Sequence, residues 1–284
     1  MSYTLNIRGR LMDLSEPQVM GILNVTPDSF YDGSRQQTEE QIALRAQQIV
    51  AEGGTLIDVG AYSTRPDATA VSEEEEMERL RFALPIVRRE APDVAVSVDT
   101  FRPSVARVVV EELGADIIND VSGGNANGAF GGAQPTDVEE NPAMFRMVAR
   151  LGVPYILMST QRDVRSMLLT FARQVQQLRD LGQKDIIIDP GFGFGKTLEE
   201  NYGVMHSLEQ LQLLGLPVLV GVSRKSMIYR LLGGSPDTAL NGTTVLNTLA
   251  LERGAKILRV HDVKEAVECV KITMQTNSKL SNSK

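Results

Sequence analysis

The sequence is poor in the residues that build disulfide frameworks and transition-metal sites. Its 284 residues include no tryptophan, two histidines and a single cysteine, Cys269. One cysteine excludes an intrachain disulfide and a cysteine cluster for zinc, and two histidines without such a cluster argue against zinc or iron. Aromatic residues make up 5% of the chain, so aliphatic side chains must fill its core. Cys269 is predicted to be a small buried hydrophobic residue.

Excess positive charge and long apolar runs are missing as well. The net charge is −7, which argues against non-specific binding to nucleic acid or to an anionic membrane. Residues 1–20 contain no apolar core of the signal-peptide kind. No run approaches the roughly 18 apolar residues of a membrane-spanning helix. We expect a soluble protein of a reducing compartment, the cytoplasm.

Apolar runs alternate with helical patterns along almost the whole chain. The first run, about 18–25, reaches Asn24 and then meets Thr26-Pro27-Asp28-Ser29, which cannot continue a strand. Further runs of this kind occupy 55–60, 94–99, 116–121, 153–158, 185–189, 217–222 and 256–261. Helical patterns follow them at 38–50, from Ser72 onward, and at 103–113, 142–151, 163–181, 198–214, 238–253 and 263–274.

This alternation predicts a single (β/α)8 TIM barrel. Repeated βα units require parallel strands with right-handed crossovers, and about eight units in about 250 residues are typical of that barrel. A doubly wound open sheet is the competing architecture, and the strand count favours the barrel. Weak alternation around Arg8-Gly9 predicts a short hairpin at 3–12. We therefore divide the chain into a lead-in with this hairpin (1–16), a barrel (17–275) and a disordered tail (276–284).

Polar side chains gather where the predicted strands end. In chain order these ends present Asn24, Asp58, Asp99, Asn119, Ser159, Asp189, Ser223 to Lys225, Arg259 and His261. A lone aspartate at such a position more often caps the next helix. Polar residues end nearly every predicted strand, which is more than helix capping alone would explain. Because the active site of this barrel lies at the carboxyl ends of its strands, we expect these residues to meet at one mouth.

One subset of these residues suits a flat, polar ligand. Asp99, Asn119, Asp189 and Lys225 combine hydrogen-bond acceptors, an amide and a cationic donor. Such a set matches a planar heterocycle with a guanidine-like N–H edge and ring acceptors. The alternative for these residues alone is a purely structural lysine–aspartate network.

A second subset indicates an anion site. Arg259 and His261 are two residues apart on the last strand, so their side chains point the same way. Together with Thr64 and Arg65 they form a basic group where barrels often bind phosphate. The alternative is a surface salt bridge.

Two other features receive no catalytic role. Gly191 to Thr197 resembles a phosphate loop, but Pro190 stands where a Walker motif needs glycine. Its glycines are better explained by close approach of the backbone to a flat ligand. His206 is isolated on a helix and is predicted to be structural.

Mg²⁺ held by an amide oxygen and a substrate phosphate stays compatible with the sequence.

Seven motifs occur in one order along the chain. They are Gly21-Ile22-Leu23-Asn24-Val25-Thr26-Pro27-Asp28-Ser29-Phe30, Ser63-Thr64-Arg65-Pro66, Ser97-Val98-Asp99-Thr100, Ile118-Asn119-Asp120, Asp189-Pro190-Gly191-Phe192-Gly193-Phe194-Gly195-Lys196, Ser223-Arg224-Lys225-Ser226 and Arg259-Val260-His261-Asp262. In this series the sequence resembles the dihydropteroate synthases, the sulfonamide targets of folate biosynthesis, over about residues 17–275.

The resemblance implies a transferase that condenses 6-hydroxymethyl-7,8-dihydropterin diphosphate with 4-aminobenzoate and releases pyrophosphate. It implies that the pterin is held by Asp99, Asn119, Asp189 and Lys225. It implies that the diphosphate is held by Asn24, Thr64, Arg259 and His261, with Asn24 as a ligand of Mg²⁺. It places near 4-aminobenzoate Phe30, Ser63, Arg65, Pro66, Phe192 and Ser223. The implied catalytic residues are Asn24, Asp99, Lys225, Arg259 and His261, and the implied assembly is a homodimer through outer helices.

The sequence departs from the family pattern at one strand end and one loop. Met158-Ser159-Thr160-Gln161 stands where relatives commonly have Met-His-Met-Gln, and the loop 122–141 is longer than in the family. That loop either covers the mouth or is a surface insertion. Two alternatives to the synthase stay open: a pterin-binding methyltransferase barrel and a non-catalytic pterin-binding paralogue. Binding residues for a diphosphate argue against the first, and intact subsites argue against the second.

Overall fold

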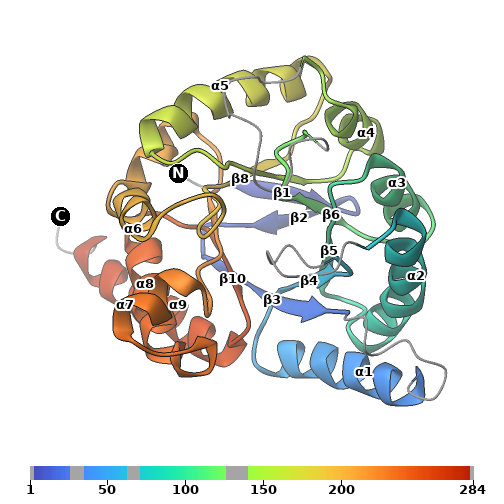
Figure 1. Cartoon of the computed structure of the whole chain (residues 1–284), viewed down its shortest axis with the longest axis horizontal. Coiled ribbons are helices and arrows are strands. Elements are labelled where there is room, and N and C mark those ends of the chain that lie inside the picture. The colour runs from blue at the N-terminus through green and yellow to red at the C-terminus, as the bar shows by residue number, and fades with distance from the viewer. Residues whose placement is uncertain (1–2, 26–34, 63–70, 126–139, 282–284) are drawn as a thin grey trace.

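Eight parallel strands form a ring with helices packed around it (Figure 1). The computed structural model describes residues 3–25, 35–62, 71–125 and 140–281. The strands of the ring are β3 (Gln18–Asn24), β4 (Leu56–Gly60), β5 (Ala95–Asp99), β6 (Ile117–Asp120), β7 (Tyr155–Met158), β8 (Ile186–Asp189), β9 (Leu219–Val220) and β10 (Ile257–Val260). They pair in the order β8-β7-β6-β5-β4-β3-β10-β9. A parallel bridge between Ile188 and Val218 joins the two end strands, so the prediction of a TIM barrel is confirmed over the open sheet.

The helices follow the predicted alternation with two differences. Their bounds are α1 (Arg35–Ala51), α2 (Glu73–Glu90), α3 (Pro103–Glu111), α4 (Ala143–Leu151), α5 (Val164–Asp180), α6 (Leu198–His206), α7 (Ser226–Leu232), α8 (Leu240–Glu252) and α9 (Val263–Ser281). Helix α7 was not predicted, because its seven residues are too few to show a helical period. The predicted helix 198–214 divides into α6 and a 3₁₀ helix, η2 (Leu208–Leu214).

The last helix runs further than expected. The sequence predicts a disordered tail from residue 276, whereas α9 continues to Ser281. This part of the prediction was wrong because no glycine or proline follows Gly254, so nothing in the chain terminates the helix. In the described part of the chain, no helix is long and apolar enough to cross a membrane.

The barrel interior has an apolar floor at the amino ends of its strands. Each of the eight strands contributes one buried residue to it: Met20, Leu56, Ala95, Ile117, Ile156, Ile187, Leu219 and Ile257. Side chains alternate along a strand with a period of two, so the residue two positions further on each strand also faces the interior. The floor therefore sets which residues form the layer above it.

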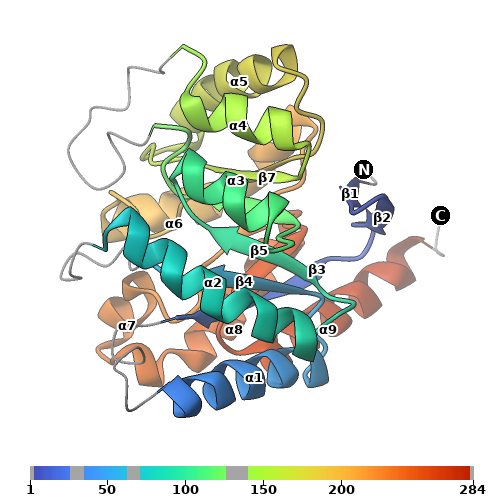
Figure 2. The same ribbon diagram turned by 90° about the vertical axis from the view of Figure 1, so that its right-hand side faces the viewer.

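The predicted N-terminal hairpin is present and closes this floor. Strands β1 (Thr4–Ile7) and β2 (Arg10–Asp13) pair antiparallel, and Arg8 and Gly9 both have positive φ in the turn between them. This is the turn that best matches the twist of a hairpin. Leu5 and Leu14 pack into the floor cluster with almost no exposure. In the side view the hairpin lies beyond the amino ends of the strands (Figure 2).

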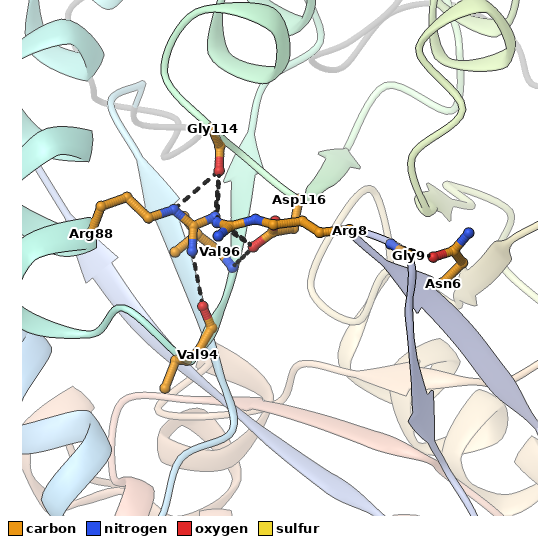
Figure 3. A network of polar contacts seen from close by, with 8 residues as sticks. All are labelled: Asn6, Arg8, Gly9, Arg88, Val94, Val96, Gly114 and Asp116. Carbon is orange, nitrogen blue, oxygen red and sulfur yellow. Dashed lines mark hydrogen bonds and ion pairs between the residues drawn. The ribbon is translucent and has the colours of Figure 1, made fainter.

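An ion-pair network fastens the hairpin to the barrel wall (Figure 3). The carboxylate of Asp116, which is buried before β6, pairs with Arg8 of the hairpin and with Arg88 of α2. Both arginines also donate to the carbonyl of Gly114, and Asp116 Oδ2 accepts the N–H of Val96 at 2.7 Å. Ion pairs thus attach the hairpin to the amino end of the barrel. The polar residues predicted for the site lie at the opposite end, where the strands terminate.

Candidate active site

The layer above the floor is polar on five of its strands. Counting two residues on from the floor reaches Asp58, Ser97, Asn119, Asp189 and Arg259. Two residues further, the strands and their ends present Asn24, Asp99, Ser223 and His261. Period-two alternation therefore brings into one mouth the described residues that the sequence predicts for two separate subsites.

Asp58 connects three of these strands, β4, β6 and β10, through one buried carboxylate. Its Oδ2 accepts hydrogen bonds from Arg259 Nε at 2.7 Å and from Asn119 Nδ2 at 3.1 Å. Arg259 Nη2 reaches Asp99 Oδ2 at 3.4 Å. Asp58 is fully buried, and the second oxygen of its side chain has no partner among the described residues, nor does Asn119 Oδ1. An unpartnered buried oxygen is costly, so Asn119 is an acceptor ready for a ligand N–H.

Two carboxyl groups of the mouth hold protons more tightly than usual. Burial and the Asp58 carboxylate raise the pKa of Asp99 to about 7, with Arg259 acting in the opposite direction. Burial also raises the pKa of Asp189, and the Lys225 cation partly opposes this. Carboxyl groups with perturbed pKa values in a shared mouth are typical of functional sites.

Lys225 lies against the loop that follows β8. Its ammonium donates to the carbonyl of Phe192 and stands 4.8 Å from the centre of the Phe194 ring. Burial lowers the pKa of Lys225 to about 8, although Asp189 favours its charged form. Asp189 Oδ1 accepts the N–H of Gly191 at 2.7 Å. The loop therefore contacts two charged residues of the predicted pterin set, Asp189 and Lys225.

The same loop places its two phenylalanines in different surroundings. The side chain of Phe192 is fully buried in the main hydrophobic core, and its contact with 4-aminobenzoate stays a prediction. Phe194, two residues on, is half-buried and faces Lys225. The sequence alone could not separate the two phenylalanines, because glycines with positive φ at 191, 193 and 195 redirect the chain between them.

His261 and Ser223 form a pair at the ends of β10 and β9. Ser223 Oγ lies 3.0 Å from His261 Nδ1 and accepts the backbone N–H of His261 at 3.1 Å. Burial and the Arg259 cation lower the pKa of His261 to about 4, so the ring is neutral at neutral pH. Its Nε2 is the nitrogen left for a ligand. Ser223, predicted to lie near 4-aminobenzoate, thus also orients a residue of the predicted anion subsite.

Asn24 ends β3 and is exposed at the mouth. It pairs in register with Gly60, which in turn pairs with Asp99. A Cβ at Gly60 would lie 3.2 Å from Asn24 Oδ1, so the missing side chain leaves room for the amide. Among the described residues no group of three or more His, Cys, Asp or Glu could hold a metal. One amide oxygen fits Mg²⁺ whose other ligands are phosphate oxygens and waters.

Some predicted site residues lie outside the part of the chain that the structure describes. They are Phe30, Ser63, Thr64, Arg65 and Pro66, and residues 126–139 of the long loop are in the same position. Their roles stay predictions.

Arg45 of α1, which the sequence did not single out, donates to the carbonyl of Ile22 and to that of His261 at 2.6 Å. It links the strand ends that carry Asn24 and His261, and nothing in its helical context signals this.

Comparisons with known proteins agree with this geometry. A family model described as pterin binding enzyme matches residues 20–261. A dihydropteroate synthase of Escherichia coli K12 is 38% identical over 294 aligned positions, covering 98% of both chains, and one of Bacillus subtilis is 38% identical over 89% of this chain and 86% of its own. The structure of Xanthomonas albilineans dihydropteroate synthase with 4-aminobenzoic acid superposes with a TM-score of 0.83, at 36% identity over 98% and 99% of the two chains. That of the Yersinia pestis enzyme with a sulfonamide drug gives a TM-score of 0.82, at 37% identity over 98% and 100%.

Proposed function

The chain belongs to the dihydropteroate synthase family of pterin-binding enzymes, and from this membership we propose how its mouth performs the reaction. It is a transferase of folate biosynthesis that condenses 6-hydroxymethyl-7,8-dihydropterin diphosphate with 4-aminobenzoate to 7,8-dihydropteroate and pyrophosphate. The relatives reported above are synthases, and no observation favours the methyltransferase barrel or the non-catalytic paralogue.

The pterin is held by Asp99, Asn119, Asp189 and Lys225. Asn119 Oδ1 has no partner among the described residues, and it accepts an N–H of the ring. Asp189 accepts from the guanidine-like edge, since a carboxylate pairs with two adjacent N–H groups. Lys225 exchanges its contact with the Phe192 carbonyl for a ring acceptor of the pterin. The unpartnered amide oxygen beside a buried charge network is the observation that carries this proposal.

The diphosphate is held on the other side of the mouth by Arg259, His261, Asn24 and Thr64. Arg259 supplies a fixed positive charge, and His261 supplies Nε2–H as a neutral donor because its pKa is about 4. Asn24 Oδ1 is proposed as the protein ligand of Mg²⁺. When bound, that ion would neutralise charge on the departing diphosphate.

In the reaction the bond between the pterin methylene carbon and the diphosphate oxygen breaks, and pyrophosphate leaves with the electron pair. The ring system then carries positive charge, which the ionised carboxylates of Asp99 and Asp189 stabilise. The aminobenzoate nitrogen forms the new C–N bond and loses a proton to water. An arylamine needs correct placement more than a strong base, so the protein contributes orientation and electrostatics. Ser223, beside His261, contacts 4-aminobenzoate in this proposal.

Assembly, drug binding and location complete the proposal. Apolar side chains are exposed on the last helices at Leu231, Leu232, Val245, Leu249 and Ile272. They support a homodimer through α7, α8 and α9. Sulfonamides are expected to bind this chain by analogy with the Yersinia pestis complex. A single cysteine supports a cytoplasmic location.

One assay tests the proposed function. The protein is incubated with the pterin diphosphate, 4-aminobenzoate and Mg²⁺, and pyrophosphate and dihydropteroate are measured together. We expect equimolar formation of both products. Pyrophosphate release that does not depend on 4-aminobenzoate, or no release, would contradict the proposal.

A further inference from the structure

Lys196 lies at the end of the loop between β8 and α6, next to Thr197, which caps α6. Its half-buried ammonium donates to three backbone carbonyls, those of Gly191 at 2.9 Å, Phe194 at 3.2 Å and Ser159 at 3.4 Å. A lysine ammonium has three N–H donors. Each is directed to a carbonyl, so Lys196 has no donor left for a substrate.

The loop that Lys196 holds has glycine at every second position from 191 to 195. Gly191, Gly193 and Gly195 adopt φ values of 65°, 82° and 63°. Glycine reaches this region freely but loses the most conformational entropy when it is ordered. Within this loop the carbonyls of Gly191 and Phe194 both accept hydrogen bonds from the Lys196 ammonium. The third carbonyl, from Ser159, belongs to the end of β7, so the lysine also fastens the loop to the neighbouring strand.

The residues that Lys196 fixes are those that contact the pterin set. Gly191 donates its N–H to Asp189. The segment between Gly191 and Phe194, whose carbonyls Lys196 binds, also contacts Lys225. The Phe192 carbonyl accepts a hydrogen bond from the Lys225 ammonium, and the Phe194 ring packs against that ammonium. A Cβ on Gly193 would lie 3.2 Å from Lys225 Cδ, so the backbone packs directly on the Lys225 side chain. A shift of this loop must therefore displace Asp189, Lys225 or both.

Electrostatics act in the same direction. Lys196 and Lys225 both favour the ionised form of Asp189, against the effect of its burial. Burial lowers the pKa of Lys196 to about 8, while Asp189 favours its charged form. One carboxylate thus lies within the influence of two ammonium groups, of which one is committed to the backbone and the other faces the mouth.

We propose that Lys196 is a positioning residue of the pterin subsite, which sets the loop 190–196 so that Asp189 and Lys225 are presented in binding geometry. The proposal rests on the pterin role of Asp189 and Lys225 given above. The lysine does not touch substrate itself. Its effect should therefore appear in the affinity for the pterin diphosphate and not in that for 4-aminobenzoate.

The test compares Lys196→Met, which keeps an unbranched side chain one atom shorter and removes the donors, with Lys196→Arg, which keeps charge and donors. Lys256→Met is the matched control, because Lys256 Nζ also donates to a backbone carbonyl, that of Ser15 at 3.2 Å, at the opposite end of the barrel. Pterin-diphosphate binding is measured by calorimetry, both KM values are taken at saturating second substrate, and Tm is recorded.

We expect Lys196→Met to weaken pterin-diphosphate binding about tenfold or more, as small displacements of binding groups do. The KM for 4-aminobenzoate should stay within about twofold. Lys196→Arg should recover most of the affinity, and Lys256→Met should retain both constants. An unchanged pterin affinity in folded Lys196→Met, or an equal rise in both KM values, would overturn the proposal.

A second variant and the wild-type measurement separate a failure of Lys196→Met to fold, and a failure of the proposed function, from a failure of this proposal. If Lys196→Met is unfolded, the comparison passes to Lys196→Gln, which keeps two donors, with the same expected selectivity for the pterin. Wild-type protein that fails to bind the pterin diphosphate would refute the proposed function. Wild-type binding with unaltered binding by the variants would refute only the role of Lys196.

Discussion

Asp58 Oδ2 accepts a hydrogen bond from Arg259 Nε at 2.7 Å, although the two residues are 201 positions apart in the chain. The same oxygen accepts from Asn119 Nδ2. One buried atom thereby orients an amide proposed for the pterin and a guanidinium proposed for the diphosphate. This link makes the two subsites interdependent.

Asp58→Asn should impair both subsites and the fold. An amide cannot neutralise Arg259, and loss of one partner of a buried ion pair costs about 3–5 kcal/mol. We expect the lower end of that range, because Arg259 is 19% exposed and also reaches Asp99. The free energy of unfolding is measured in urea, together with the pterin-diphosphate KM, which should rise.

Asp116→Asn is the control for this variant. Asp116 is as buried as Asp58 and pairs with two arginines, but at the floor of the barrel. We expect lower stability with an unaltered KM for the folded protein. Equal KM values in Asp58→Asn and the wild type would show that the buried carboxylate supports only the fold.

Asp189→Ala should weaken binding of the pterin substrate by roughly 1.5–3 kcal/mol, because two ring N–H groups lose an ionised acceptor. Calorimetry with the pterin diphosphate measures this directly. Asp185→Ala, in the residue just before β8, is the matched control, since that carboxylate lies at the amino end and accepts the N–H of Asn6. An affinity in Asp189→Ala equal to that of the control would remove Asp189 from the pterin subsite.

Asn24→Ala should reduce turnover more than stability. The side chain is exposed, and surface substitutions usually change stability by less than about 0.5 kcal/mol. We expect the Mg²⁺ concentration for half-maximal activity to rise about tenfold, the lower end of what weakened support of a metal site costs. A metal titration of the rate measures it. A variant that unfolds yet keeps wild-type specific activity in its folded fraction would disprove the assignment.

The pH dependence of kcat/KM should have an acid limb near 7. Asp99 must be ionised to stabilise the cationic pterin, and its pKa is about 7, so activity is lost as pH falls through that value. An alkaline limb near 8 should follow from loss of the Lys225 and Lys196 protons. His261 adds no limb in this range, because its pKa is about 4. Asp99→Asn should be slow and lack the acid limb; an unmoved limb would point to another group.

Ionisation of Asp99, which should raise activity, should lower the stability of the fold. The pKa of Asp99 is raised from 3.8 to about 7 in the folded state, so the folded state binds the proton more tightly than the unfolded chain. The stability that this group contributes is present below about pH 4 and declines as pH rises towards 7. Urea midpoints between pH 4 and 8 should fall less in Asp99→Asn than in the wild type.

The elements that were predicted well are those with a strong local signal. The eight apolar runs appear as the eight strands, and Ser72 caps α2 by accepting the N–H of Glu75 at 3.1 Å. Where local signal was weak the predictions failed, as at the short helix α7 and the division of 198–214 by Ser207. Phe192 and Phe194 share a loop and a residue type, so only backbone conformation could tell the core residue from the one that faces the mouth.

The sequence by itself determined that this protein is a barrel with polar strand ends, because strand number, period-two alternation and turn residues are properties of short segments. It also determined which residue types reach the mouth. Only the tertiary structure decided how they pair. Asp58, Asn119 and Arg259 come from separate strands whose relative height depends on the tilt and stagger of the closed ring. No local pattern encodes the meeting of these three side chains at one oxygen.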